Sequence, residues 1–217
     1  MRGGLMRVPR ARAWAVVLCA GAAASLSVAP ASADVGTSQE PIPGTPYAIE
    51  VPEGWDGVQL PKKLTIRSTT QMFKQHPAFA EAVGVDPTSK ADVKAMVKAL
   101  RGNVRLAAAD VTGDGDNVVV RTQRQDWWND LDEFRQAMEL VASTTNAEVL
   151  FDRKSKVGSD EAYMHLEQDP PQRGGHIFAE LDIRTGPNSL VAVSVSIDGD
   201  SRALAETILK SVTVRSP

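Results

Sequence analysis

The sequence 177-IFAELDIRTGPNSLVAVSVSI-197 decides the fold of this chain. Each half alternates large apolar residues with smaller or polar ones, a period typical of a strand with one buried face. A loop over residues 186–188 joins the halves into a hairpin with three apolar pairs: Ile183 with Val191, Leu181 with Val193, and Ala179 with Val195. A one-residue slip would place these groups on opposite faces, so burial selects this register.

A closing helix is predicted directly after this hairpin. Residues 198–201 (DGDS) have the composition of a turn and a helix cap. An apolar stripe at helical spacing follows, formed by Leu204, Ala205, Ile208, Leu209 and Val212.

Upstream, hydrophobic periodicity predicts further strands at residues 47–51, 64–66, 104–109, 118–123, 147–153 and 162–167. Helices are predicted at 69–83, with a break near His76 caused by Pro77, and at 89–100 and 127–141. Because hairpins dominate this order, we expect an α+β fold with a mainly antiparallel sheet flanked by helices.

The first 33 residues have the pattern of an export signal. Four arginines precede an apolar run over residues 13–28, and Ala31-Ser32-Ala33 is a small-x-small cleavage site. We expect cleavage after Ala33, a flexible lead-in over 34–46, and one domain over 47–217. The apolar run is short and interrupted, which disfavours a membrane anchor, so we expect a secreted, extracytoplasmic protein without stable membrane insertion.

Cys19 is the single cysteine and lies inside the signal. A lipoprotein signal requires a small residue before the acylated cysteine, and here that residue is Leu18. The expected mature chain therefore carries neither a lipid on cysteine nor a disulfide.

The net charge disfavours two classes of partner. The chain has 24 Lys and Arg against 27 Asp and Glu. Four of the arginines lie in the signal, so residues 34–217 keep 20 basic against 27 acidic side chains, a net charge of −7. This balance disfavours nucleic acid and anionic lipid as main partners.

The segment 47-YAIEVPEGW-55 resembles the opening of PsbP-like and LpqN-like secreted domains. The end of the chain is similar too, with a strand hairpin and a final helix that closes in 208-ILKSV-212. The resemblance implies an antiparallel sheet between helices and a mostly non-enzymatic binding or accessory role. It carries over no catalytic residues, and this chain lacks the acylated cysteine of LpqN-type lipoproteins.

Residues 110–121 partly match a calcium loop. Asp110, Asp114, Gly115 and Asp116 fit the motif, but Arg121 occupies the position that needs a bidentate glutamate. Asp and Gly also form hairpin turns without a metal, and this interpretation is favoured. We expect no metal and no cofactor.

The histidines on predicted strands suggest one further metal hypothesis. If the strands before and after Pro170 pair closely, His165 and His176 face each other, and Glu167 or Glu180 joins a zinc site. Two surface histidines on neighbouring strands are the favoured alternative.

Known motifs for nucleophilic or phosphate chemistry are missing from the sequence. The pair Trp127-Trp128 is unusual: helical spacing places Trp127 on the core-facing side and Trp128 at its rim, where an aromatic ring binds ligands. We expect a non-enzymatic accessory or binding module at the cell envelope, whose partner is an envelope protein or small ligand. The alternatives are a hydrolase with acidic residues in a cleft near Trp128, and a protein–protein scaffold.

Overall fold

The computed structural model describes residues 37–60, 64–100, 103–112, 115–124, 131–198 and 201–215. A seven-stranded sheet lies at its centre, with every neighbouring pair antiparallel. Its order is β3 (Trp55–Gln59), β4 (Val104–Asp110), β5 (Asn117–Arg124), β9 (Ser189–Ile197), β8 (Ile177–Gly186), β7 (Asp160–Gln168) and β6 (Glu148–Val157). A smaller sheet contains β1 (Thr37–Pro41), β2 (Tyr47–Pro52) and β10 (Thr213–Val214), with β2 in the middle.

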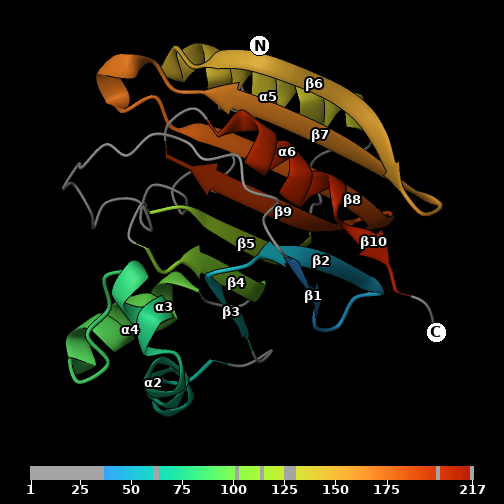
Figure 1. Ribbon diagram of the computed structural model, residues 1–217. Coiled ribbons are helices and arrows are strands. Elements are labelled where there is room, and N and C mark those ends of the chain that lie inside the picture. The colour runs from blue at the N-terminus through green and yellow to red at the C-terminus, as the bar shows by residue number, and fades with distance from the viewer. Residues whose placement is uncertain are drawn as a thin grey trace, which may run out of the picture.

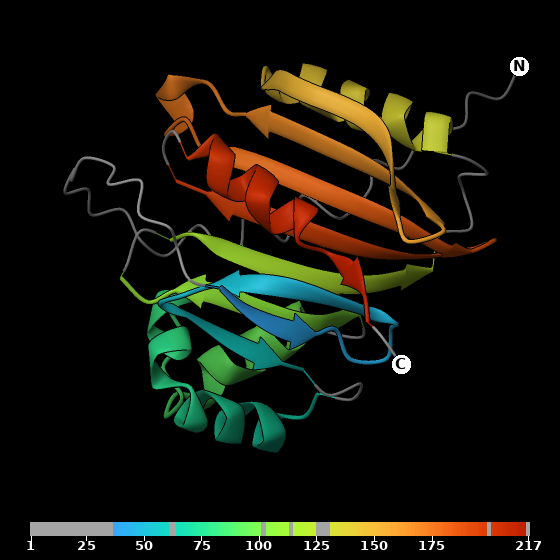
Figure 2. The same ribbon diagram turned by 45° about the vertical axis from the view of Figure 1, so that its right-hand side comes forward.

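The molecule has three layers (Figures 1 and 2). One face of the large sheet is covered by α6 (Arg202–Lys210) and the small sheet. The other face carries α2 (Ile66–Gln75), α3 (Pro77–Ala82) and α4 (Lys90–Ala99) near β3 and β4, while α5 (Leu131–Thr145) packs on β6 and β7. This arrangement confirms the predicted α+β class.

The register of the β8–β9 hairpin is the predicted one. Ile183 pairs with Val191, and the next two apolar pairs follow in step. The loop is shorter than expected, because Gly186 pairs with Ser189 after an irregularity between Arg184 and Gly186. The apolar face of this hairpin lies fully buried beneath α6, whose Ala205, Ile208 and Leu209 form the predicted stripe.

Several other elements match the sequence predictions. The helix expected over 69–83 is broken at His76 into α2 and α3, because Pro77 begins the second helix. Ser89 caps α4 by accepting a hydrogen bond from the Asp92 backbone N–H. The start of the helix expected at Trp127 lies outside the described residues, which enter α5 at Leu131.

Two expectations for the N-terminal part were wrong, and one strand was missed. The lead-in contains β1, which pairs with β2 from Thr37 to Pro41. Residues 64–66 form no strand, because Thr65 caps α2 in a reciprocal capping box with Ser68. Strand β3, which begins at Trp55, was not predicted.

None of the helices within the described ranges has the length and hydrophobicity that crossing a membrane requires.

The core position of Leu181 gives a stability prediction. Leu181 is 1% exposed between the sheet and α6, whereas Leu140 on α5 is 51% exposed. Leu181→Ala should lower the free energy of unfolding by about 2–5 kcal/mol, because it leaves a cavity. Leu140→Ala should change it by less than about 0.5 kcal/mol. Chemical denaturation of the protein measures both, and equal losses would contradict this core.

Candidate functional site

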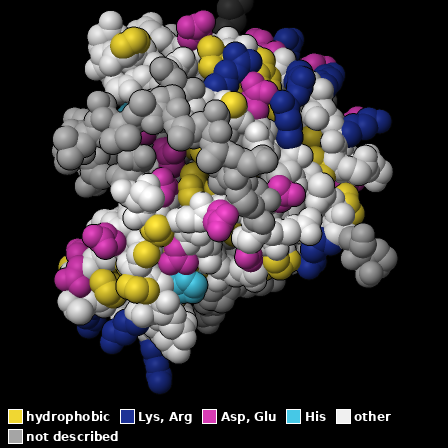
Figure 3. Space-filling model, in the orientation of Figure 1, with side chains coloured by type: hydrophobic (Ala, Val, Ile, Leu, Met, Phe, Trp, Pro, Cys, Tyr) yellow, Lys and Arg dark blue, Asp and Glu magenta, His cyan; other side chains and the backbone are white. Residues whose placement is uncertain are grey.

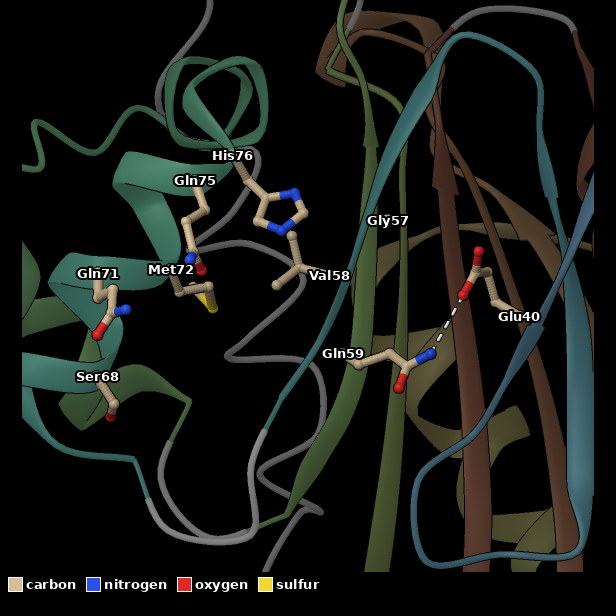
Figure 4. A pocket seen from close by; sticks show the side chains of 9 residues that line it. All are labelled: Glu40, Gly57, Val58, Gln59, Ser68, Gln71, Met72, Gln75 and His76. Atoms are coloured by element: carbon tan, nitrogen blue, oxygen red, sulfur yellow. Dashed lines mark hydrogen bonds between the residues drawn. The ribbon is translucent and has the colours of Figure 1, made fainter.

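A pocket of about 450 Å³ lies beside strand β3, at one end of the large sheet (Figure 4). Helix α2 forms one side of it and β1 the other. We call this the edge pocket, and its lining residues are Glu40, Gly57, Val58, Gln59, Ser68, Gln71, Met72, Gln75 and His76.

The backbone of β3 supplies the base of the edge pocket. Leu60 donates its backbone N–H to the Arg105 carbonyl at 2.8 Å, and Val58 lies opposite Ala107 in the same ladder. Backbone groups of successive strand residues point to opposite edges, so those of Gly57 and Gln59 point away from β4. Because β3 ends the sheet order, these groups face the pocket rather than another strand of the sheet.

Helix α2 supplies polar side chains from its open face. Its apolar residues Met72 and Phe73 are buried against the sheet. Ser68, Gln71 and Gln75 lie three and four residues apart, so they share a second face of the helix, which lines the pocket. This side therefore presents two amides and the Met72 thioether, while the Ser68 hydroxyl is engaged with Thr65 in the capping box.

His76 stands where α2 ends, and its ring points between α2 and β3 (Figure 4). Its Nδ1 atom lies 2.9 Å from Asp56 Oδ1, and the Phe79 backbone N–H donates to Asp56 Oδ2 at 3.3 Å. The Asp56 carboxylate thus joins β3 to the corner between α2 and α3. Since Nδ1 is engaged, Nε2 is the imidazole atom left for a ligand.

The β1 side of the pocket is acidic. Gln59 Nε2 donates to Glu40 Oε2 at 3.2 Å, which holds the carboxylate beside the open edge of β3.

A second cavity, of about 420 Å³, lies where β5 and β8 end and β9 begins. The turn before β2 and Arg105 line it as well.

A buried polar cluster occupies the sheet face that carries α2–α5. Register places His165 of β7 opposite Glu180 of β8, and Glu180 opposite Ser194 of β9. The cluster comprises Arg121, His165, Glu167, Glu180, Asp182, Ser194 and Ser196, all of them at most 9% exposed.

Burial and neighbouring charges shift the pKa values of two groups in this cluster, Asp182 and Arg121. Burial raises the pKa of Asp182 well above its ordinary value, the neighbouring Glu180 carboxylate raises it further, and Arg121 opposes both. Burial lowers the pKa of Arg121, while Glu180 and Asp182 act in the other direction. Within the described residues, Asp182 Oδ2 and His165 Nδ1 are buried without a hydrogen-bond partner.

The predicted meeting of His165 and His176 was wrong, and His165 is fully buried rather than a surface histidine. His165 contacts Glu167 at 3.2 Å and faces Glu180, the two glutamates named from the sequence. His176, however, precedes β8 and pairs with Asp198 at 3.1 Å, so it does not meet His165. Among the described residues, no three His, Cys, Asp or Glu side chains are grouped as they would be around a metal ion.

The calcium-loop positions form a hairpin turn between β4 and β5. Asp110 accepts hydrogen bonds from the backbone and hydroxyl of Thr112, at 2.8 and 2.7 Å. Asp116 accepts from the Asp198 backbone N–H, and Arg121 lies in the buried polar cluster. Asp114 lies outside the described residues.

The proposed hydrolase cleft and the Trp128 contact lie outside the described residues, because 125–130 are among those not described. Within the described ranges, Glu180 and Asp182 are two residues apart on one strand rather than across a cleft.

On the face drawn in Figure 3, acidic and basic side chains are interspersed.

Sequence reasoning missed the edge pocket. Its signal was the polar face of α2, where Ser68, Gln71 and Gln75 recur at helical spacing. The strand opposite left almost no signal, because Trp55 to Gln59 contains Gly57 and no apolar alternation.

No family model matches this chain, and no curated protein matches it. Solved structures similar to it include cyanobacterial PsbP (CyanoP) from Synechocystis sp. PCC 6803, at 13% identity and a TM-score of 0.44, covering 88% of this chain and 99% of that one. LpqN, involved in cell envelope biogenesis of Mycobacterium tuberculosis, is similar at 9% identity and 0.37, covering 85% and 93%. A Pseudomonas aeruginosa protein of unknown function gives 8% and 0.36, covering 83% and 98%. The resemblance to PsbP-like and LpqN-like domains is therefore loose and structural, and it concerns the fold alone.

The buried carboxyl of Asp182 predicts a pH dependence of stability. Its folded-state pKa is raised, so its favourable contribution is complete below the unfolded value near 3.8 and is lost as the pH rises through the folded pKa. Asp182→Asn should gain stability relative to the wild type as the pH rises from 3 toward neutral, because only the wild type must then bury a charged carboxylate.

Asp132→Asn is the matched control, because hydrogen bonding to Lys154 lowers the pKa of Asp132. Its difference from the wild type should have the opposite sign, with the wild type favoured above the unfolded pKa. Urea melts from pH 3 to 8 measure all three proteins. If the difference in unfolding free energy between Asp182→Asn and the wild type did not change with pH, the pKa of Asp182 would not be raised in the folded protein.

Proposed function

We propose that this chain is an extracytoplasmic, non-enzymatic accessory module that binds its partner in the edge pocket. The signal-like N-terminus supports the compartment, with its four arginines, apolar run and Ala31-Ser32-Ala33 site. The partner is an envelope protein or a small ligand. It binds through hydrogen bonds and is released chemically unchanged.

The observation that carries this proposal is the chemistry of the pocket lining. The amides of Gln59, Gln71 and Gln75 and the β3 backbone groups that point away from β4 offer hydrogen-bond donors and acceptors in a recess of about 450 Å³. A few directed polar groups around a concave surface with some apolar area are typical of a recognition site.

The His76–Asp56 pair favours a second candidate, a hydrolase in which His76 activates water. A histidine oriented by a carboxylate is a recurring general base. In this chain Asp56 also accepts from the Phe79 N–H at the start of α3, which gives the pair a structural role at the α2–α3 corner. Binding without turnover is therefore the favoured function.

A capture experiment with matched variants tests the proposal. Gln71→Arg places a long cation in the pocket, and Gln136→Arg makes the same change on the exposed face of α5. Both sites are exposed, so each variant should keep its stability within about 0.5 kcal/mol. Tagged wild type and both variants are incubated with the host's envelope fraction, and the captured molecules are identified by mass spectrometry.

We expect one partner captured by the wild type and by Gln136→Arg, lost with Gln71→Arg, and recovered with unchanged mass. Capture that is insensitive to Gln71→Arg would remove the edge pocket from the function. A partner returned cleaved, with cleavage abolished by His76→Gln, would establish the hydrolase instead.

A further inference from the structure

We propose that the edge pocket binds an extended polypeptide segment of the partner, which pairs with β3 as an eighth strand of the large sheet. This inference rests on the proposed function and names the class of ligand. It follows from the position of the pocket along a sheet edge.

The first argument is the direction of the β3 backbone. Val58 and Leu60 direct their backbone groups to β4, as the Leu60 to Arg105 hydrogen bond fixes. The backbone N–H and C=O of Gly57 and Gln59 consequently point into the pocket. An incoming extended chain satisfies these four groups in a geometry that a compact small molecule does not reproduce.

The second argument is the recess around this edge. Gln71 and Gln75 of α2 stand on one side, and Glu40 of β1 stands on the other. Pairing with the β3 of a second folded copy would bring the α2 and β1 of that copy against these two sides. The recess therefore admits a single extended segment and excludes edge-to-edge pairing of two sheets.

The third argument is the match between the two sides and the two faces of a strand. Alternate side chains of the bound segment point toward α2 and toward β1. Those toward α2 meet amides, the Met72 thioether and the His76 ring, whereas those toward β1 meet Glu40. Glu40 carries the formal charge among the described lining residues, so Lys or Arg is favoured on the β1-facing positions.

The probe is a peptide selected from a phage-displayed library of random dodecapeptides. The protein without its signal-like N-terminus serves as bait. The affinity of the peptide is measured by calorimetry for the wild type, Gln59→Pro and Gln59→Ala. Both variants lose the side chain that holds Glu40, but only proline also removes the N–H that points into the pocket. Proline is tolerated on an edge strand where its nitrogen faces away from the ladder.

We expect Gln59→Pro to bind at least about tenfold more weakly than Gln59→Ala, the loss expected for a hydrogen bond to a well-placed backbone group. Equal affinities of the two variants would overturn strand pairing. Strand pairing in the edge pocket would also be overturned if Gln71→Arg left the binding of every selected peptide intact.

A second measurement uses the wild-type protein and does not depend on the folding of a variant. Each peptide amide is methylated in turn, which removes one donor at a time. Strand pairing predicts that binding is lost at every second amide, because only alternate amides face β3. Loss without this period, or loss at side chains alone, would overturn the inference.

These outcomes separate the inference from the proposed function. If envelope capture depends on Gln71 but not on the Gln59 amide, the partner binds in the edge pocket without joining the sheet. If capture is insensitive to both, the edge pocket is not the binding site.

Discussion

The register of the central strands is the constraint on which this structure depends. In β8, apolar Leu181 and Ile183 alternate with Glu180 and Asp182, and the pairing with β7 and β9 keeps each set on its own face. The apolar face is buried by α6 and the small sheet. A one-residue shift would bury carboxylates in that core, at a cost far beyond the stability of a domain this size.

The large sheet ends at β3 on one side and at β6 on the other, and the edge pocket lies beside β3. Helices α2–α4 pack on one face of the sheet at β3–β5, and the small sheet packs on the opposite face. An edge strand held between two covering layers keeps unpaired backbone groups while being protected from other sheets. The fold thus builds a recess at the place where its sheet ends, and Asp56 fixes its corner through His76.

Periodicity predicted the parts of this fold that are strongly amphipathic. The β8–β9 register, α6, and the helix break at Pro77 all follow from apolar spacing or a missing donor. Polar segments carried no such signal, so β1 and β3 were missed. The placement of His165 beside Glu180, rather than His176, depends on a register across a long loop, which local sequence does not encode.

Amide hydrogen exchange along β3 tests the central claim, an open strand edge, most directly. In the unbound protein the Gly57 and Gln59 amides should exchange at least about tenfold faster than the Val58 amide, because only Val58 donates into the ladder. Fast exchange at alternate residues would support an edge poised for pairing. Uniform protection of all three amides would contradict it, since another group would already occupy the edge.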